Sequence, residues 1–187
     1  MAGDLLFTIG HSTHPIDEFI GMLGAHGVTA LADVRTVAKS QHNPQFNEDV
    51  LSTSLRECGL AYHRLALLGG LRRARAGSEN AAWTNASFRG YADYMQTAQF
   101  REGIEQLTAL GATSCTAIMC AEAVPWRCHR SLIGDALLVR GFLVLDIMTK
   151  RSAKPHLLTS FAVVEGVRVT YPAPDRVAAG NELAAAD

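Results

Sequence analysis

The densest group of reactive side chains in this sequence lies between Cys120 and Arg130, in the order Cys-Ala-Glu-Ala-Val-Pro-Trp-Arg-Cys-His-Arg. Two thiols, Cys120 and Cys128, stand on either side of the carboxylate of Glu122, and His129 and Arg130 follow the second thiol directly. A thiolate is a nucleophile and a soft metal ligand, a carboxylate can act as a general base, and a guanidinium binds anions. The segment therefore indicates a chemical site.

One arrangement uses a cysteine as nucleophile. We expect Cys128 to open a helix over residues 128–140, because a helix N-terminus lowers the pKa of a thiol. Cys120 or Cys128 would then attack an anionic substrate held by neighbouring arginines, with Glu122 as acid or base. This chemistry is that of a cysteine-thiolate transferase or hydrolase acting on a phosphate-bearing or otherwise anionic substrate, nucleotides among them. The run from Cys120 to Arg127 is one residue too long for the phosphate loop of cysteine phosphatases.

A second arrangement uses Cys120, Cys128 and His129, with His11 as a further candidate, as ligands of zinc or iron. Glu122 would then act as a base beside a metal-bound water. Two features argue against a metal: the segment has no Cys-x-x-Cys pair, and adjacent residues of a helix point about 100° apart. The sequence therefore favours a site without a cofactor. A third arrangement is a redox sensor in which Cys120 and Cys128 form a reversible disulfide.

These residues must be positioned by a sheet. The chain contains five apolar runs of strand length, at residues 5–9, 28–34, 60–65, 114–119 and 142–147. Helical patterns separate them at residues 15–27, 47–58, 88–110, with a break near Thr97, and 128–140. Strands joined by helices form parallel sheets, so the pattern predicts a three-layer α/β sandwich of about five strands with helices on both faces. A small hairpin is expected at residues 163–169.

Three of the predicted strands end in reactive residues, and ligands of open parallel sheets bind at the carboxyl ends of the strands. His11 and Ser12 follow the first strand, Asp33 and Arg35 end the second, and Cys120 ends the fourth. The expected catalytic residues are His11, Cys120, Glu122 and Cys128. The expected substrate-binding residues are Ser12, Asp33, Arg35, Arg72, Arg127, His129 and Arg130.

A rival function is a non-catalytic nucleic-acid or nucleotide sensor. Residues 69–87 form a long predicted loop that carries Arg72, Arg73 and Arg75, and Trp83 or Trp126 could stack on a base. The formal net charge of -1, from 17 basic and 18 acidic side chains, argues against a general nucleic-acid binder. Any anion site is therefore expected to be local.

Composition bounds the remaining choices. The 187 residues, 48% hydrophobic and 19% charged, are typical of a globular protein, and we expect one domain over residues 1–172 with a flexible tail over 173–187. No basic residue precedes the first apolar run, and no apolar run is long enough to cross a membrane. We therefore expect a cytoplasmic protein without membrane contact, whose four cysteines serve as thiols or ligands.

Several motifs in order resemble the family called domain of unknown function 488. They are Thr8-Ile-Gly-His-Ser12, Asp33-Val-Arg35, Asn43-Pro-Gln-Phe46, Leu68-Gly-Gly70, Phe88-Arg-Gly-Tyr91, Met119-Cys-Ala-Glu122 and Cys128-His-Arg130. The resemblance implies a compact cytoplasmic α/β domain and directs attention to the Cys-x-Glu and Cys-His-Arg positions. A weaker similarity to rhodanese-like domains concerns topology: there the strand corresponding to residues 114–119 ends in a sulfur-carrying cysteine, which would be Cys120.

Overall fold

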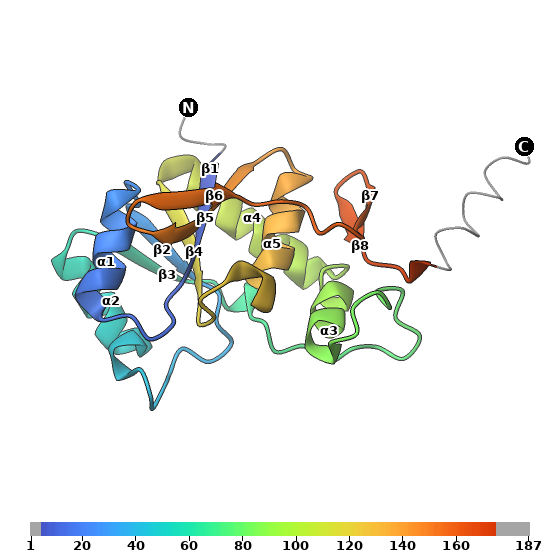
Figure 1. The fold of residues 1–187 in the computed structure, drawn as a ribbon, viewed down its shortest axis with the longest axis horizontal. Helices are drawn as coiled ribbons and strands as arrows, with labels where there is room; N and C mark the ends of the chain where they lie inside the picture. Colours follow the sequence, from blue (N-terminus) through green and yellow to red (C-terminus); the bar gives the residue numbers. More distant parts are fainter. Residues whose placement is uncertain (1–4, 175–187) are drawn as a thin grey trace, which may run out of the picture.

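The computed structural model describes residues 5–174, which form a six-stranded sheet covered by helices (Figure 1). The strand order is β3-β2-β4-β1-β5-β6, and all neighbouring strands are parallel except β6, which runs antiparallel to β5. The strands are β1 (Leu5–Gly10), β2 (Ala30–Asp33), β3 (Ala61–Arg64), β4 (Thr116–Cys120), β5 (Leu143–Thr149) and β6 (Ser152–Pro155). The predicted mostly parallel α/β sheet is thus confirmed.

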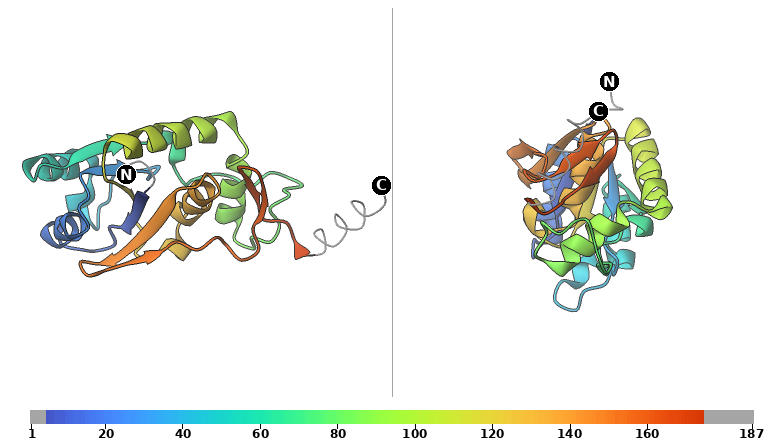
Figure 2. Two further views of the ribbon diagram at one scale, coloured as in Figure 1. Left: turned by 90° about the horizontal axis from the view of Figure 1, so that it is seen from above. Right: turned by 90° about the vertical axis from the view of Figure 1, so that its right-hand side faces the viewer.

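Helices cover both faces of the sheet, as predicted, and each face has its own apolar core (Figure 2). The α-helices are α1 (Ile16–Ala25), α2 (Glu48–Glu57), α3 (Ala86–Tyr94), α4 (Ala98–Thr113) and α5 (Arg130–Leu138). Phe19 of α1 and Leu51 of α2 pack on one face, whereas Ile104 of α4 and Leu132 of α5 pack on the other. Strand residues alternate between the two cores, as the two-residue repeat of a strand requires.

The boundaries follow local sequence signals. Pro15 precedes α1, Asn47 precedes α2, and Gly27 and Gly59 lie just beyond the two helices with positive φ angles of 70° and 76°. The side chain of Thr97 caps α4 by accepting a hydrogen bond from the backbone amide of Phe100, so the predicted break between α3 and α4 is confirmed. Short 3-10 helices occur at η1 (Pro44–Phe46), η2 (Ala66–Leu68) and η3 (Pro125–Arg127).

The sixth strand, β6, is not predicted by the sequence pattern. β6 has four residues, includes Lys154 and Pro155, and lies at the edge of the sheet, where a strand needs no apolar run. It follows β5 after a turn at residues 150–151. The expected count of about five strands therefore describes the parallel core, and β6 adds an antiparallel edge.

The predicted hairpin is present as β7 (Val163–Glu165) and β8 (Arg168–Thr170), and Arg168 binds Glu79 of the long loop that precedes α3. Asp93 of α3 holds this loop by accepting hydrogen bonds from the amide of Arg75, the hydroxyl of Ser78 and the side-chain amide of Asn80. Trp83 stacks on Phe88 and packs into the core cluster that includes α3 and α5. The loop is thus ordered without a helix or strand of its own. Apart from its first two residues, the tail expected over 173–187 lies outside the described residues.

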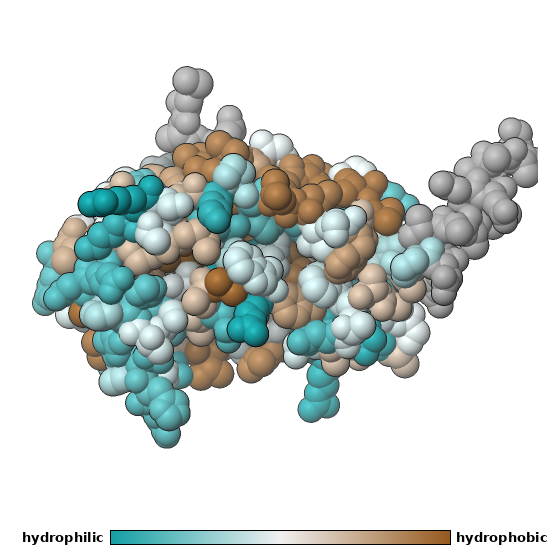
Figure 3. All heavy atoms as spheres, in the orientation of Figure 1, coloured by the Kyte–Doolittle hydropathy of each residue, from teal (hydrophilic) through white to brown (hydrophobic). Residues whose placement is uncertain are grey.

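Exposed apolar side chains gather in the C-terminal third of the chain. They include Leu143, Leu157, Leu158, Phe161, Val164 and Val167. On the face drawn in Figure 3, apolar residues lie mainly along the upper edge, above α5 and toward the hairpin. None of the helices formed by residues 5–174 has the length and apolar character needed to span a membrane.

A buried charged cluster ties β5 to α5. His156 lies between Asp146 and Asp135, with Nδ1 3.1 Å from an Asp146 oxygen and Nε2 3.2 Å from an Asp135 oxygen. The hydroxyls of Thr8 and Tyr171 also donate to these carboxylates. Burial alone lowers the pKa of His156, but its hydrogen bonds to Asp135 and Asp146 outweigh this effect and raise the pKa to about 9. The imidazolium therefore neutralises one of two buried carboxylates.

This cluster makes stability fall at alkaline pH. The folded-state pKa of His156, about 9, exceeds the ordinary value of 6.5, so its stabilisation is complete below about pH 6.5 and is lost as the pH rises through 9. We expect the free energy of unfolding, measured by denaturant titration, to fall by about 2 kcal/mol more in the parent than in His156→Gln between pH 6.5 and 9. His63→Gln, at an exposed position of β3, is the control and should follow the parent. Equal pH dependence in His156→Gln and the parent would contradict this assignment.

Candidate active site

The strand ends that carry reactive residues are neighbours in the sheet. β4 lies between β2 and β1, and the register pairs Gly10 with Cys120 and Asp33 with Met119. The pairing continues past β1, because the amides of His11 and Ser12 donate to the carbonyls of Cys120 and Ala121. The three central strands therefore deliver their last residues to one edge of the sheet.

After Cys120 the chain turns back over the end of β1. A Cβ atom at Gly10 would overlap the carbonyl oxygen of Glu122, so this approach requires glycine. Arg130, 1% exposed, reaches back from α5 and donates to the carbonyl oxygens of Glu122 and Ala123. The guanidinium thus binds backbone groups that no helix or strand satisfies.

Beside this turn, the side chains of Cys120, Cys128 and His129 meet. Nδ1 of His129 lies 3.7 Å from the sulfur of Cys120 and 3.7 Å from the sulfur of Cys128. Nε2 lies 3.1 Å from the carbonyl oxygen of Val34, which can only accept, so Nε2 carries the hydrogen. In the neutral ring, Nδ1 therefore directs its lone pair at both sulfurs.

The expectation that Cys128 opens a helix is wrong. Val124 is extended, residues 125–127 form a short 3-10 helix, and Cys128 is again extended with φ -137° and ψ 145°. The helix begins two residues later, at Arg130. The 100° divergence expected between Cys128 and His129 does not apply, because Cys128 is not helical. Both side chains converge on Cys120, and the geometric argument against a metal is overturned.

The two thiols influence each other. Both are buried and lie close together, and their mutual interaction lowers the pKa of Cys128 and raises the pKa of Cys120. Burial raises both pKa values, and the nearby charge of Arg130 lowers both. The interaction therefore drives the pKa values of the two thiols apart.

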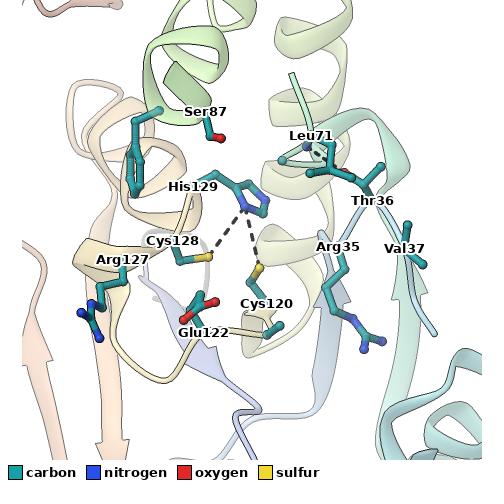
Figure 4. A pocket seen from close by; sticks show the side chains of 13 residues that line it. Arg35, Thr36, Val37, Leu71, Ser87, Cys120, Glu122, Arg127, Cys128 and His129 are labelled. Carbon is teal, nitrogen blue, oxygen red and sulfur yellow. Dashed lines mark hydrogen bonds between the residues drawn. The ribbon is translucent and has the colours of Figure 1, made fainter. Parts of the chain in front are cut away.

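A cavity of about 380 Å³, the sulfur pocket, opens in front of these thiols (Figure 4). Its chemically active lining consists of Arg35, Cys120, Glu122, Arg127, Cys128 and His129, and Leu71 and Phe88 are among its apolar residues. In Figure 4 the exposed Glu122 carboxylate lies beside the two sulfurs, with Arg127 on one side and Arg35 on the other. The sulfur pocket thus places a carboxylate that can act as a base, Glu122, near two cationic side chains, Arg35 and Arg127.

A second cavity of about 430 Å³, the polar pocket, adjoins the first and shares Arg35, Val37, Ala121 and Glu122 with it. Its other lining residues include His11, Ser12, Thr13, Lys39, Ser40 and Asn43. Ser12 takes a positive φ of 47°, which a residue other than glycine seldom adopts. Lys39, Ser40 and Asn43 were not expected at the site, although they follow a strand end in the sequence.

Arg35, 5% exposed, forms the wall between the two pockets and is held on both sides. Its Nε and one terminal nitrogen donate to the Asp33 carboxylate at 2.9 and 2.6 Å. Its other terminal nitrogen lies 3.3 Å from Nε2 of His11. Burial lowers the pKa of His11 to about 4, so this ring is neutral and accepts the hydrogen bond. Three of the five guanidinium N–H groups are thereby used, and two remain.

Three expected ligand-binding residues lie elsewhere. Asp33 is fully buried and binds Arg35 and Tyr62, and Arg130 is buried beneath the turn. Arg72 donates to the carbonyls of Gly69 and Leu67 and lies over the ring of Tyr94. None of the three lines either pocket. Sequence order alone could not show this, because strand ends bring both wall and support residues to the same edge.

Loss of the Arg130 guanidinium should loosen the turn. In Arg130→Gln two carbonyl oxygens of the turn lose their buried charged donor, and we expect the free energy of unfolding to fall by about 2 to 4 kcal/mol in urea titrations. Arg127→Gln is the control, because Arg127 is exposed and makes no ion pair among residues 5–174; its effect should stay within about 0.5 kcal/mol. Equal stability of the two variants would exclude this supporting role.

Comparison with known proteins gives a family and no function. A family model described as Domain of unknown function DUF488 matches residues 15–137, well over half of the chain. The match runs from the start of α1 into α5, so it includes Arg35 and the Cys120–Arg130 segment but begins after β1 and His11. No curated protein and no solved structure matches the chain. The chain belongs to the family described as Domain of unknown function DUF488.

Proposed function

We propose that this protein is a hydrolase of small phosphate-bearing or otherwise anionic molecules, nucleotides among them. The observation that carries the proposal is the wall shared by the sulfur and polar pockets, where Arg35 stands beside Glu122. Hydrolysis of a charged ester requires a hydrogen-bond donor that binds the anion and a group that transfers protons, and both lie at the junction of the two cavities.

Arg35 is suited to the anion because its position is fixed before any ligand binds. Asp33 and His11 hold the guanidinium from two sides, and its two unused N–H groups can bind two oxygens of one phosphate or carboxylate. Asp33 also faces Arg64, whose terminal nitrogen lies 3.5 Å from the carboxylate. The single negative charge of Asp33 is therefore shared by two arginines.

Further positive charge comes from Lys39 in the polar pocket and Arg127 in the sulfur pocket. Neither forms an ion pair within residues 5–174, and both are exposed. These charges offset the carboxylate of Glu122, which would otherwise repel an anion. A substrate can thus place its anionic group near Arg35 and Lys39 and an apolar portion against Leu71 and Phe88.

In the proposed reaction Glu122 accepts a proton from a water molecule. The water oxygen bonds to the phosphorus or acyl carbon, the bond to the leaving oxygen breaks, and the proton returns to that oxygen. Arg35 stabilises the negative charge that develops on the remaining substrate oxygens. Arg130 and Asp33 act as positioning residues, since they hold the turn and the guanidinium.

The nucleic-acid sensor is less well supported. Trp83 packs against Phe88 in the core, and Arg72 donates to backbone carbonyls, so neither offers a free surface for a base or phosphate. Arg73 and Arg75 alone remain exposed among the arginines of the loop.

Anion binding can be measured without knowing the substrate. We expect inorganic phosphate and pyrophosphate to bind the parent at low salt, measured by isothermal titration calorimetry. Lys39→Gln should weaken binding about fivefold, and Arg35→Gln more strongly because that donor is buried and preorganised. Lys154→Gln, which removes an exposed lysine from the edge strand, is the matched control and should bind as the parent does. Unchanged affinity in Lys39→Gln and Arg35→Gln, or no binding by the parent, would exclude the anion site.

Catalysis is tested with phosphate monoesters and diesters such as 4-nitrophenyl phosphate and its bis ester. Glu122→Gln should lower the rate of nitrophenol release at least about 100-fold, the range typical of a lost general base. Phosphate affinity should be kept or increased, because the substitution removes a negative charge from the shared wall. Full activity in Glu122→Gln would rule out the assigned role.

A further inference from the structure

We infer that Cys120, Cys128 and His129 bind a zinc ion. This metal site stands on the side-chain geometry alone; only its use in hydrolysis rests on the proposed function. All three donor atoms lie within 4.8 Å of one another, and no other His, Cys, Asp or Glu between residues 5 and 174 joins the group.

The distances agree with a tetrahedral zinc centre. Zn–S bonds of about 2.3 Å and Zn–N bonds of about 2.0 Å at tetrahedral angles place sulfur and nitrogen about 3.6 Å apart. Here Nδ1 of His129 is 3.7 Å from each sulfur. Small adjustments of the side chains would therefore suffice to bind the ion.

The orientation of the His129 ring also suits a metal ligand. The tautomer fits as well, because Nε2 donates to the carbonyl of Val34 and leaves Nδ1 as the ligand atom. Metal-binding histidines commonly use their second nitrogen in this way.

The imidazole of His129 is held in place by its surroundings. A Cβ atom at Gly70 would overlap the ring, so the chain passes directly against it on that side. Tyr91 packs against the ring with centroids 4.9 Å apart, and its hydroxyl donates to the carbonyl of Leu68. Such a preformed ligand is expected where a site must select one coordination geometry.

Three protein ligands leave one tetrahedral position for a water or a substrate oxygen. The cluster lines the sulfur pocket, so this position has access to the cavity that also contains Glu122. A Cys₂His set with one open position is a known form of catalytic zinc site, whereas structural sites are closed by a fourth protein ligand. In the proposed hydrolysis, the ion would lower the pKa of the water from which Glu122 takes a proton.

The ligand types favour zinc over harder ions. Two thiolates and one imidazole suit zinc or ferrous iron, whereas magnesium and calcium prefer oxygen donors. Two thiolates also balance the charge of a divalent ion, which matters because both sulfurs are buried. A redox dithiol is the competing explanation for two adjacent cysteines, and it predicts a disulfide and no metal.

The test is elemental analysis of untagged full-length protein, produced with supplemented zinc and iron and purified under reducing conditions. We expect about one zinc ion per chain in the parent. The same content is expected in Cys58→Ser and Cys115→Ser, which replace the two cysteines outside the cluster. Cys120→Ser, Cys128→Ser and His129→Asn should retain less than about a tenth of it.

A second measurement covers ligand variants that fold poorly. Cobalt(II) added to chelator-treated, reduced parent should give the intense near-ultraviolet thiolate band and the visible bands of a tetrahedral site, and zinc should displace it. No zinc in the purified parent together with no cobalt spectrum would overturn the inference, as would iron in place of zinc. If the metal-free parent contains a Cys120–Cys128 disulfide and still binds no metal after that disulfide is reduced, the two cysteines form a redox pair instead. Phosphate titration of the metal-free parent tests the anion site separately, so the two proposals can fail independently.

Discussion

Between the end of β4 and the start of α5 the chain crosses over the end of β1, and the carbonyl oxygens of this crossing are bound by the buried guanidinium of Arg130. The placement of Glu122 beside the sulfur cluster depends on this contact. The crossing sets the position of Glu122, and His129 directly precedes Arg130 in the chain. The Arg130 side chain therefore links the acid-base group Glu122 to the sulfur cluster. Gly10 completes the constraint, because a larger residue there would displace the turn.

The sheet itself could be predicted because its strands are apolar and its helices show clear faces. Leu5–Gly10, Ala30–Asp33 and Thr116–Cys120 are buried on both sides, which gives continuous apolar runs in the sequence. β6 lacked this signal, since an edge strand tolerates lysine and proline. The break near Thr97 and the hairpin over 163–169 were predictable from capping and turn chemistry.

The composition of the candidate site was predictable, but its internal organisation was not. Strand ends identified Arg35, Cys120 and Glu122, because parallel strands bring their carboxyl ends together. The same logic could not distinguish Arg35, which lines both pockets, from Arg130, which is buried below them. It also predicted the wrong backbone conformation at Cys128, because a 3-10 helix over Pro125–Arg127 precedes α5, which begins only at Arg130. The side chains of Cys128 and His129 converge because the φ and ψ angles of Cys128 are extended, and no residue type in the segment specifies those angles.

The three residues of the sulfur cluster come from one short stretch of chain, whereas Arg35 and His11 come from strands far away in the sequence. An ion could therefore be chelated by the unfolded polypeptide, since closing so short a loop costs little entropy. Affinity for the unfolded chain reduces the stabilisation that a ligand gives to the native state. The metal would then contribute less to thermal stability than its affinity suggests, and loading could occur before the sheet has formed.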